Sequence, residues 1–243
     1  MLRPRTRAAL AAARARGLRV IVVTGRMFQA VRPYLTGSEP VVCYQGAAVA
    51  DPATGRFLRH VPIPLELARE GIEAIQSAGY GLNCYADDEL YVAQVTPEAA
   101  RYASSQHIQL RVVGPLLDWL DQPPTKLVVV GDPQRLNVLG ADLRAQFDGR
   151  MFIAKSLPFF LELAHPEVSK GSGLQFVADR LGFAPAGTVA FGDGENDLEL
   201  IDWAGYGIAV ENAHPFVKER ADLVCPSAEE EGVAQVIEAF LAR

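Results

Sequence analysis

Short, nearly continuous apolar runs constrain the fold of this chain more than any other feature. Residues 18–23, 40–44 and 187–191 form such runs, and they are rich in β-branched side chains. Strands of this composition are buried on both faces, as in parallel sheets. Residues 27–35 and 169–182 lie next to these runs and have patterns typical of helices. The alternation predicts an α/β fold, a Rossmann-like, doubly wound parallel sheet with helices on both faces.

The middle of the chain has a different pattern. Residues 65–78 and 133–147 are predicted helices. Strands are predicted at 81–86, 89–95, 126–131, 150–155 and 159–163, and several of them alternate apolar with polar residues. Alternation favours an antiparallel sheet with one face against helices. The strand–helix alternation returns at the end of the chain, with helices at 195–204, 214–220 and 229–241 and strands at 206–210 and 222–224. We therefore predict a core of residues 1–60 and 164–243 and an inserted α/β domain of residues 61–163.

Composition excludes several classes of function. The formal charge of −6 over 243 residues argues against a nucleic-acid partner, and no apolar run approaches the roughly 20 residues that cross a bilayer. The three cysteines and four histidines are scattered without metal-ligand spacing, so we expect buried thiols in a reducing cytoplasm and no histidine metal site. Residues 1–17 are rich in arginine. We expect a surface helix there, packed by Leu10 and the alanines, in preference to a basic targeting helix.

An acidic, glycine-rich loop follows the predicted strand 187–191. It comprises residues 192–197 (GDGEND) and leads into a helix, so Asp193, Asn196 and Asp197 are expected at the carboxyl end of a strand. Open α/β sheets bind ligands at these ends. Carboxylates there suit Mg²⁺, which is held by one or two carboxylates together with substrate phosphate. The alternative is an ordinary surface turn, because Asp, Asn and Gly also dominate turns.

Two further features are expected at the same edge. Thr24 and Gly25 directly follow the first apolar run, and Lys170 opens the predicted helix 169–182. A lysine at a helix N-terminus can neutralise a phosphate that the helix itself already favours. Taken singly, a threonine after a strand is commonly a cap and a lysine is commonly solvated. Their combination with the acidic loop, around an inserted domain, indicates one phosphate site.

With these motifs the sequence resembles the haloacid dehalogenase superfamily, and within it the Cof-type phosphatases with an α/β cap. The matching stretches cover nearly the whole chain: VIVVTGR (20–26), VCYQGA (42–47), VSKGSGL (168–174), FGDGENDLELI (191–201), GIAVENA (207–213), ADLV (221–224) and EEEGVAQVI (229–237). One position departs from the family pattern, because Gln45 stands where asparagine usually precedes Gly-Ala.

The resemblance implies roles for individual residues. Thr24, with Gly25, corresponds to the hydroxyl motif that holds the transferring phosphoryl group, and Lys170 to the lysine between nucleophile and phosphate. Asp193 corresponds to the metal ligand, here for Mg²⁺. Asn196 would contact the phosphate, and Asp197 would orient Lys170 or a metal-bound water. Phosphoryl transfer depends mainly on such positioning and charge stabilisation.

The family's opening motif is missing from the sequence. These enzymes carry a strand running into Asp-x-Asp-Gly-Thr, whose first aspartate is the covalent nucleophile. Here no aspartate precedes Asp51, and Asp51 belongs to a predicted turn. Asp87 and Asp88 are expected in a loop of the inserted domain. We expect in-frame codons upstream of Met1 to encode the missing strand and motif.

These features leave two main hypotheses and one weaker alternative. The first is a Mg²⁺-dependent phosphatase of small phosphorylated metabolites such as sugar phosphates, which forms an aspartyl-phosphate in its full-length form and whose cap sets the substrate. The second is a non-catalytic protein that binds phosphate or phosphorylated metabolites through the same pocket. The third is a nucleotide-binding Rossmann domain, which lacks a G-x-G-x-x-G after the first strand. Neither the substrate nor the oligomeric state follows from the sequence.

Overall fold

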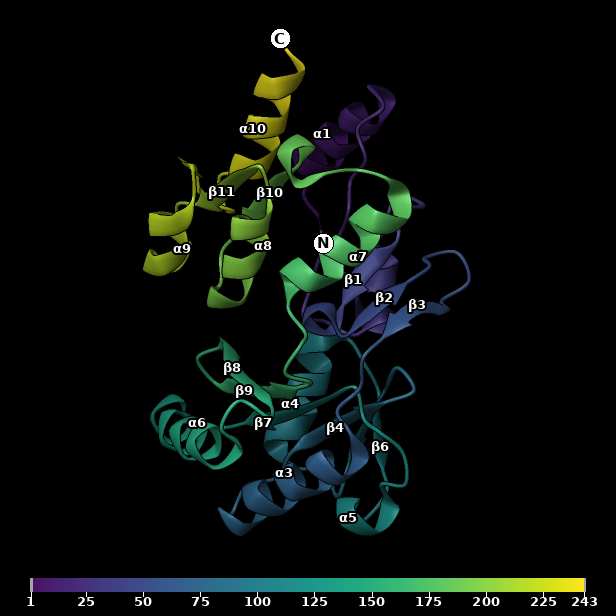
Figure 1. Cartoon of the computed structure of the whole chain (residues 1–243), viewed down its shortest axis with the longest axis vertical. Coiled ribbons are helices and arrows are strands. Elements are labelled where there is room, and N and C mark those ends of the chain that lie inside the picture. The colour runs from purple at the N-terminus through teal and green to yellow at the C-terminus, as the bar shows by residue number, and fades with distance from the viewer. Residues whose placement is uncertain (1, 243) are drawn as a thin grey trace.

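The computed structural model describes residues 2–242 and divides into two halves, a core and a cap (Figure 1). The chain begins and ends in the core. Along the way it forms a six-stranded sheet with its own helices, which makes up the cap. The capped α/β fold expected from the sequence is confirmed, whereas the exact division at residues 61 and 163 stays a prediction.

One part of the core is a parallel three-stranded sheet near the C-terminus. Its order is β10 (Val189–Gly192), β11 (Tyr206–Val210) and β12 (Leu223–Cys225). The helices α8 (Leu198–Trp203) and α9 (Pro215–Arg220) connect these strands, as predicted. The apolar cluster beneath them includes Leu174, Ile201, Ile208 and Val217.

A second core sheet is antiparallel, which the sequence did not predict. It has the order β1 (Val41–Cys43), β2 (Ala48–Ala50) and β3 (Phe57–His60). The chain reverses after β1 because Tyr44, Gln45 and Gly46 all take positive φ, at 52°, 60° and 100°. Only glycine adopts this region readily, so the turn is built against the conformational preference of two of its residues.

The predicted strand 18–23 is reduced to a short extended segment. Val22 and Val23 lie beside β1, where the Val42 amide donates to the Val22 carbonyl and the Thr24 amide donates to the Val42 carbonyl, each at 2.9 Å. Among residues 2–242, no strand pairs with the other edge of this segment or with the free edge of β10. The pairing with β1 is limited to a single bridge between Val23 and Val42, so the run does not form a full strand.

Helices cover the core at its periphery. The helix α1 (Pro4–Ala15) packs against α10 (Gly232–Leu241), with Ala9 and Ala13 buried and an Arg5–Glu238 ion pair at the surface (Figure 1). The remaining core helices are the short α2 (Phe28–Val31) and α7 (Lys170–Leu181). No helix within residues 2–242 combines the length and apolar character needed to cross a bilayer.

The cap sheet has the strand order β6-β5-β4-β7-β9-β8. Its strands are β4 (Asn83–Ala86), β5 (Glu89–Val92), β6 (Leu110–Val112), β7 (Lys126–Val130), β8 (Phe152–Leu157) and β9 (Phe160–Ala164). All its pairings are antiparallel except β5–β6. These two run parallel because the helix α4 (Pro97–Gln106), which the sequence analysis did not predict, crosses between them.

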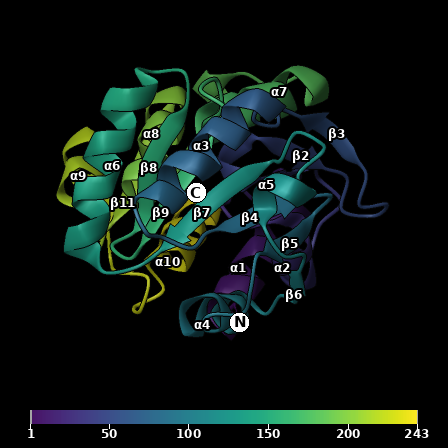
Figure 2. The same ribbon diagram turned by 90° about the horizontal axis from the view of Figure 1, so that it is seen from below.

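The two faces of the cap sheet pack against different partners, one against helices of the cap and the other against the core. Three helices lie on the face remote from the core, as the view from below shows: α3 (Leu65–Ser77), α5 (Leu116–Trp119) and α6 (Pro133–Phe147) (Figure 2). On the opposite face, Tyr85, Val128 and Phe160 share one apolar cluster with core residues such as Tyr44 and Val168. The cap is therefore packed directly onto the core next to the strand ends.

Candidate phosphate site

A buried ion pair lies at the N-terminus of α7. Ser169 caps this helix by accepting a hydrogen bond from the Ser172 amide, and Lys170 is its first residue. The Lys170 Nζ lies 2.5 Å from Asp197 Oδ1, and both side chains are almost fully buried. The positive end of a helix disfavours an ammonium group. Asp197 offsets this, so lysine and aspartate form one structural unit.

The acidic loop is folded around Asp197. Its Oδ2 accepts hydrogen bonds from the amides of Asp193 and Gly194, at 2.9 and 3.0 Å. The fold admits only glycine at 192, because a Cβ there would lie 2.6 Å from the Asp197 Cβ. Both carboxylate oxygens of Asp197 are thus occupied by protein donors, which makes it a positioning group for Lys170 and for the loop.

Asp193 is the predicted metal ligand and remains accessible to solvent. Its amide donates to Asp197 and its carbonyl accepts from the His214 amide at 2.8 Å, so the backbone fixes the loop while the carboxylate is left for a ligand. Desolvation by the surrounding protein and the nearby Asp197 raise the pKa of Asp193, and Lys170 opposes this effect. Within residues 2–242, no three His, Cys, Asp or Glu side chains gather as a ready metal cluster.

Thr24 and Gly25 lie where the extended segment ends. The Thr24 carbonyl accepts from the Gln45 amide at 3.1 Å, and its hydroxyl accepts from the Arg26 amide at 3.2 Å. Gly25 is in close contact with Gln45, since a Cβ on Gly25 would lie 2.4 Å from Gln45 Nε2. The loop after the first apolar run is therefore fixed against the turn that follows β1.

Gln45 connects this loop with the acidic loop. Asn196 Nδ2 donates to Gln45 Oε1 at 3.0 Å. All six residues singled out from the sequence thus belong to one connected set: Thr24, Gly25, Lys170, Asp193, Asn196 and Asp197. The position at which the sequence departs from the family pattern turns out to be a link between the two loops.

Two charged residues of the cap also reach this set, and the sequence analysis did not find them. Lys126 Nζ donates to the Gly25 carbonyl at 2.9 Å and to Glu162 Oε2 at 3.1 Å, and Gln45 Nε2 donates to Glu162 Oε2 at 3.3 Å. Burial lowers the pKa of Lys126, but the Glu162 carboxylate and Tyr102 together outweigh burial, and the net pKa is raised. The lysine is therefore a cation at neutral pH.

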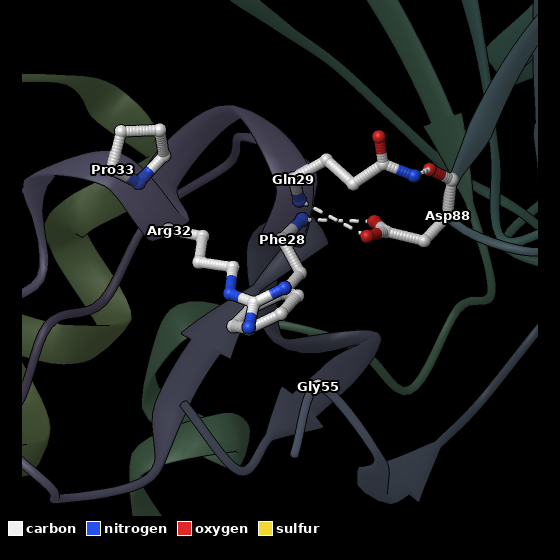
Figure 3. Close-up of a pocket in the computed structure, with 6 residues that line it drawn as sticks. All are labelled: Phe28, Gln29, Arg32, Pro33, Gly55 and Asp88. Carbon is white, nitrogen blue, oxygen red and sulfur yellow. Dashed lines mark hydrogen bonds between the residues drawn. The ribbon is translucent and has the colours of Figure 1, made fainter. Parts of the chain in front are cut away.

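A cavity of about 420 Å³ lies elsewhere on the junction between cap and core (Figure 3). Its lining includes Asp88, whose carboxylate accepts from the Phe28 and Gln29 amides at 2.9 and 3.0 Å and from the Tyr44 hydroxyl at 2.8 Å. None of the six site residues lines this cavity. Asp87 and Asp88 lie in a turn of the cap, as predicted, and Asp88 also joins the cap to the core.

The structure combines a Rossmann-like core with an inserted cap, and a lysine at a helix start paired with an acidic loop; these features agree with the family that the sequence resembles. The chain belongs to the haloacid dehalogenase-like hydrolases, whose family model matches residues 1–237. The expected family is thereby confirmed, and with it an enzyme of the hydrolase type.

Individual relatives agree with this assignment. The Bacillus subtilis protein named "Putative phosphatase YxeH" is 28% identical over 95% of this chain and 88% of its own length. The B. subtilis 5-amino-6-(5-phospho-D-ribitylamino)uracil phosphatase YitU is 26% identical over 92% of this chain and 85% of its own. The crystal structure of TM0651 from Thermotoga maritima is similar with a TM-score of 0.84 at 31% identity, covering 98% of this chain and 90% of that one.

Proposed function

We propose that the site is the phosphate pocket of a Mg²⁺-dependent phosphatase that acts on small phosphorylated metabolites. The observation that carries the proposal is the buried Lys170–Asp197 pair, whose loop also holds Asn196 in contact with the turn beside Gly25. A buried ammonium, backbone amides and an amide side chain are suitable donors for a phosphoryl group.

Each residue would contribute one element of phosphate recognition. The Thr24 hydroxyl and the amides that follow it would hold the phosphoryl oxygens. Lys170, oriented by Asp197, would neutralise charge as it accumulates on these oxygens. Asn196 has a second N–H available beside the one it gives to Gln45, and this N–H would complete the set of donors.

Asp193 would hold the cation. It supplies one accessible carboxylate, and Mg²⁺ is commonly bound by one or two carboxylates with substrate phosphate and water completing the shell. The donor set therefore fits Mg²⁺ in the presence of phosphate, and the ion would supply additional charge stabilisation at the phosphoryl oxygens. Because one carboxylate binds Mg²⁺ weakly, we expect cation and phosphate to bind cooperatively.

The substrate class rests on the relatives and on the cap. YitU, by its name, acts on a phosphorylated ribityl compound, which favours a phosphomonoester of a small polyol or sugar for this chain as well. The second candidate, a phosphate-binding protein without turnover, is favoured by one fact. Of the two carboxylates described in the site, Asp193 is assigned to the cation and Asp197 is occupied by Lys170 and two backbone amides, so neither is free to act as the nucleophile.

Calorimetric titration with inorganic phosphate, with and without Mg²⁺, tests the pocket directly, and p-nitrophenyl phosphate tests turnover. We expect Mg²⁺ to tighten phosphate binding at least tenfold in the native chain, and Asp193→Asn to abolish this gain while leaving the melting temperature unchanged. Asp202→Asn, in an exposed ion pair with Arg220, is the control and should bind normally. Turnover supports the phosphatase, and binding without turnover supports the alternative. Absence of phosphate binding would overturn both.

A further inference from the structure

The roles proposed above leave two buried charges of the cap unexplained. Lys126 on β7 and Glu162 on β9 are 2% and 5% exposed. The ammonium also lies 5.1 Å from the ring centre of Tyr85 and 5.8 Å from that of Tyr44. Burying such a pair costs desolvation free energy, which an apolar pair of similar volume would avoid. The charges therefore call for an explanation beyond stability.

Both charges make hydrogen bonds across the boundary between cap and core. Lys126 donates to the carbonyl of Gly25, which lies in the loop of Thr24. Glu162 accepts from the side-chain amide of Gln45, in the turn after β1. The cap thereby contacts the backbone of one phosphate-binding loop and the side chain that links it to the other.

The carboxylate also fixes the orientation of the Gln45 amide. A carboxylate can only accept, so Gln45 must turn its Nε2 toward Glu162 and its Oε1 toward Asn196. Asn196 in turn donates through Nδ2. Its carbonyl oxygen faces Gly194, where a Cβ would lie 2.6 Å away. The second N–H of Asn196 is left for a ligand, and its orientation depends on a charge in the cap.

The backbone conformation of Gln45 also bears on the hydrogen bond between Gln45 and Glu162. Its φ of 60° lies in the left-handed region, which is unfavourable for glutamine and better tolerated by asparagine. Asparagine is one methylene shorter, so on the same backbone its amide would be withdrawn from Glu162 Oε2, which Gln45 Nε2 reaches at 3.3 Å. Glutamine thus keeps the reach of the side chain at the expense of backbone strain.

We propose that Lys126, Glu162 and Gln45 are positioning residues that make phosphate binding in the core depend on the cap. Lys126 holds the Gly25 loop directly, and Glu162 orients Asn196 through Gln45. The proposal rests on the phosphate pocket proposed above. It implies that the cap contributes to the geometry of the phosphate site itself, in addition to covering it.

Two variants separate positioning from stability. Lys126→Met/Glu162→Met replaces the pair by apolar side chains, which is often neutral for stability, while Gly25 and Gln45 lose their partners. Gln45→Asn relieves backbone strain but loses the reach to Glu162. The matched control is Glu70→Gln, which removes an exposed ion pair between α3 and Arg150 in the cap.

The first measurement is the dissociation constant for inorganic phosphate at saturating Mg²⁺, determined by calorimetry together with the melting temperature. We expect about tenfold weaker binding in the double variant and about three- to tenfold in Gln45→Asn, from the loss of one or two hydrogen bonds. Glu70→Gln should stay within about twofold. Unchanged affinity in both test variants, with normal binding by the native chain, would overturn the proposal and leave the phosphate pocket standing.

The second measurement needs no ligand. Backbone hydrogen exchange should accelerate around residues 24–26 and 193–197 in the double variant, because two loops lose their support from the cap. Acceleration confined to β7 and β9 would overturn the positioning role, whether or not the native chain binds phosphate. Failure of the native chain to bind phosphate would count against the proposed function alone.

Discussion

Replacing Asp197 by asparagine tests whether the buried ion pair determines the structure of the site. Asparagine keeps an oxygen for the amides of Asp193 and Gly194, but it removes the carboxylate that is paired with the buried Lys170 ammonium. Breaking a buried pair in this way costs about 3–5 kcal/mol. At about 2–4 °C per kcal/mol for a chain of this size, we expect the melting temperature to fall by about 6–20 °C.

Thermal unfolding followed by circular dichroism measures this effect, with Asp202→Asn as the control. Asp202 pairs with Arg220 at the surface, and an exposed pair contributes about 0–1 kcal/mol. Asp197→Ala should be more destabilising than Asp197→Asn, because two amide donors then also lose their acceptor. A fall for Asp197→Asn no larger than that of the control would refute the reasoning.

Two other outcomes follow from packing and burial. Gly173→Ala should lower the free energy of unfolding in urea by about 1–3 kcal/mol, because its Cβ would lie 2.4 Å from Val42 Cγ1. In the control Gly187→Ala, the new Cβ meets no atom within 4 Å, and stability should be nearly unchanged. Equal losses in the two variants would contradict the close packing of α7 on β1. All three cysteines are buried, and burial raises the pKa of Cys84 to about 12. Ellman's reagent at pH 8 should therefore label none of them in the native protein and all of them in urea, and one reactive native thiol would contradict this expectation.

Much of the fold follows from local pattern. The parallel strands β10 to β12 were predictable because each is a short apolar run followed by a helical pattern. The helix α4 was also within reach of sequence analysis. Thr96 caps it by accepting from the Ala99 amide, and Pro97 occupies its first turn, which is a recognised signal for a helix start.

Other features had no local signal. The reversal after β1 depends on Tyr44 and Gln45 in the left-handed region, a conformation that neither residue type indicates. The extended form of residues 18–23 depends on which strands lie beside it. Both outcomes are decided by tertiary context.

Some residues of the candidate site could likewise be predicted from the sequence, and others could not. Asp193, Asn196 and Asp197 are close in sequence, so their loop could be recognised as a unit, and Lys170 was recognisable at the start of its helix. Lys126 and Glu162 could not be paired from the sequence. They are 36 positions apart, and each stands in a strand where alternation predicts a solvated polar side chain.

The hydrogen bond from Lys126 to the Gly25 carbonyl has a consequence for how such enzymes diversify. A cap transplanted from a relative would bring its own residues to the boundary with the core. In this protein a foreign cap without a lysine and a glutamate at these positions would leave the recipient's core with unsatisfied groups at Gly25 and Gln45. We therefore expect functional chimeras only between parents that match at Lys126, Glu162 and Gln45. A cap with this lysine and glutamate should therefore be exchangeable only among cores that carry the glutamine.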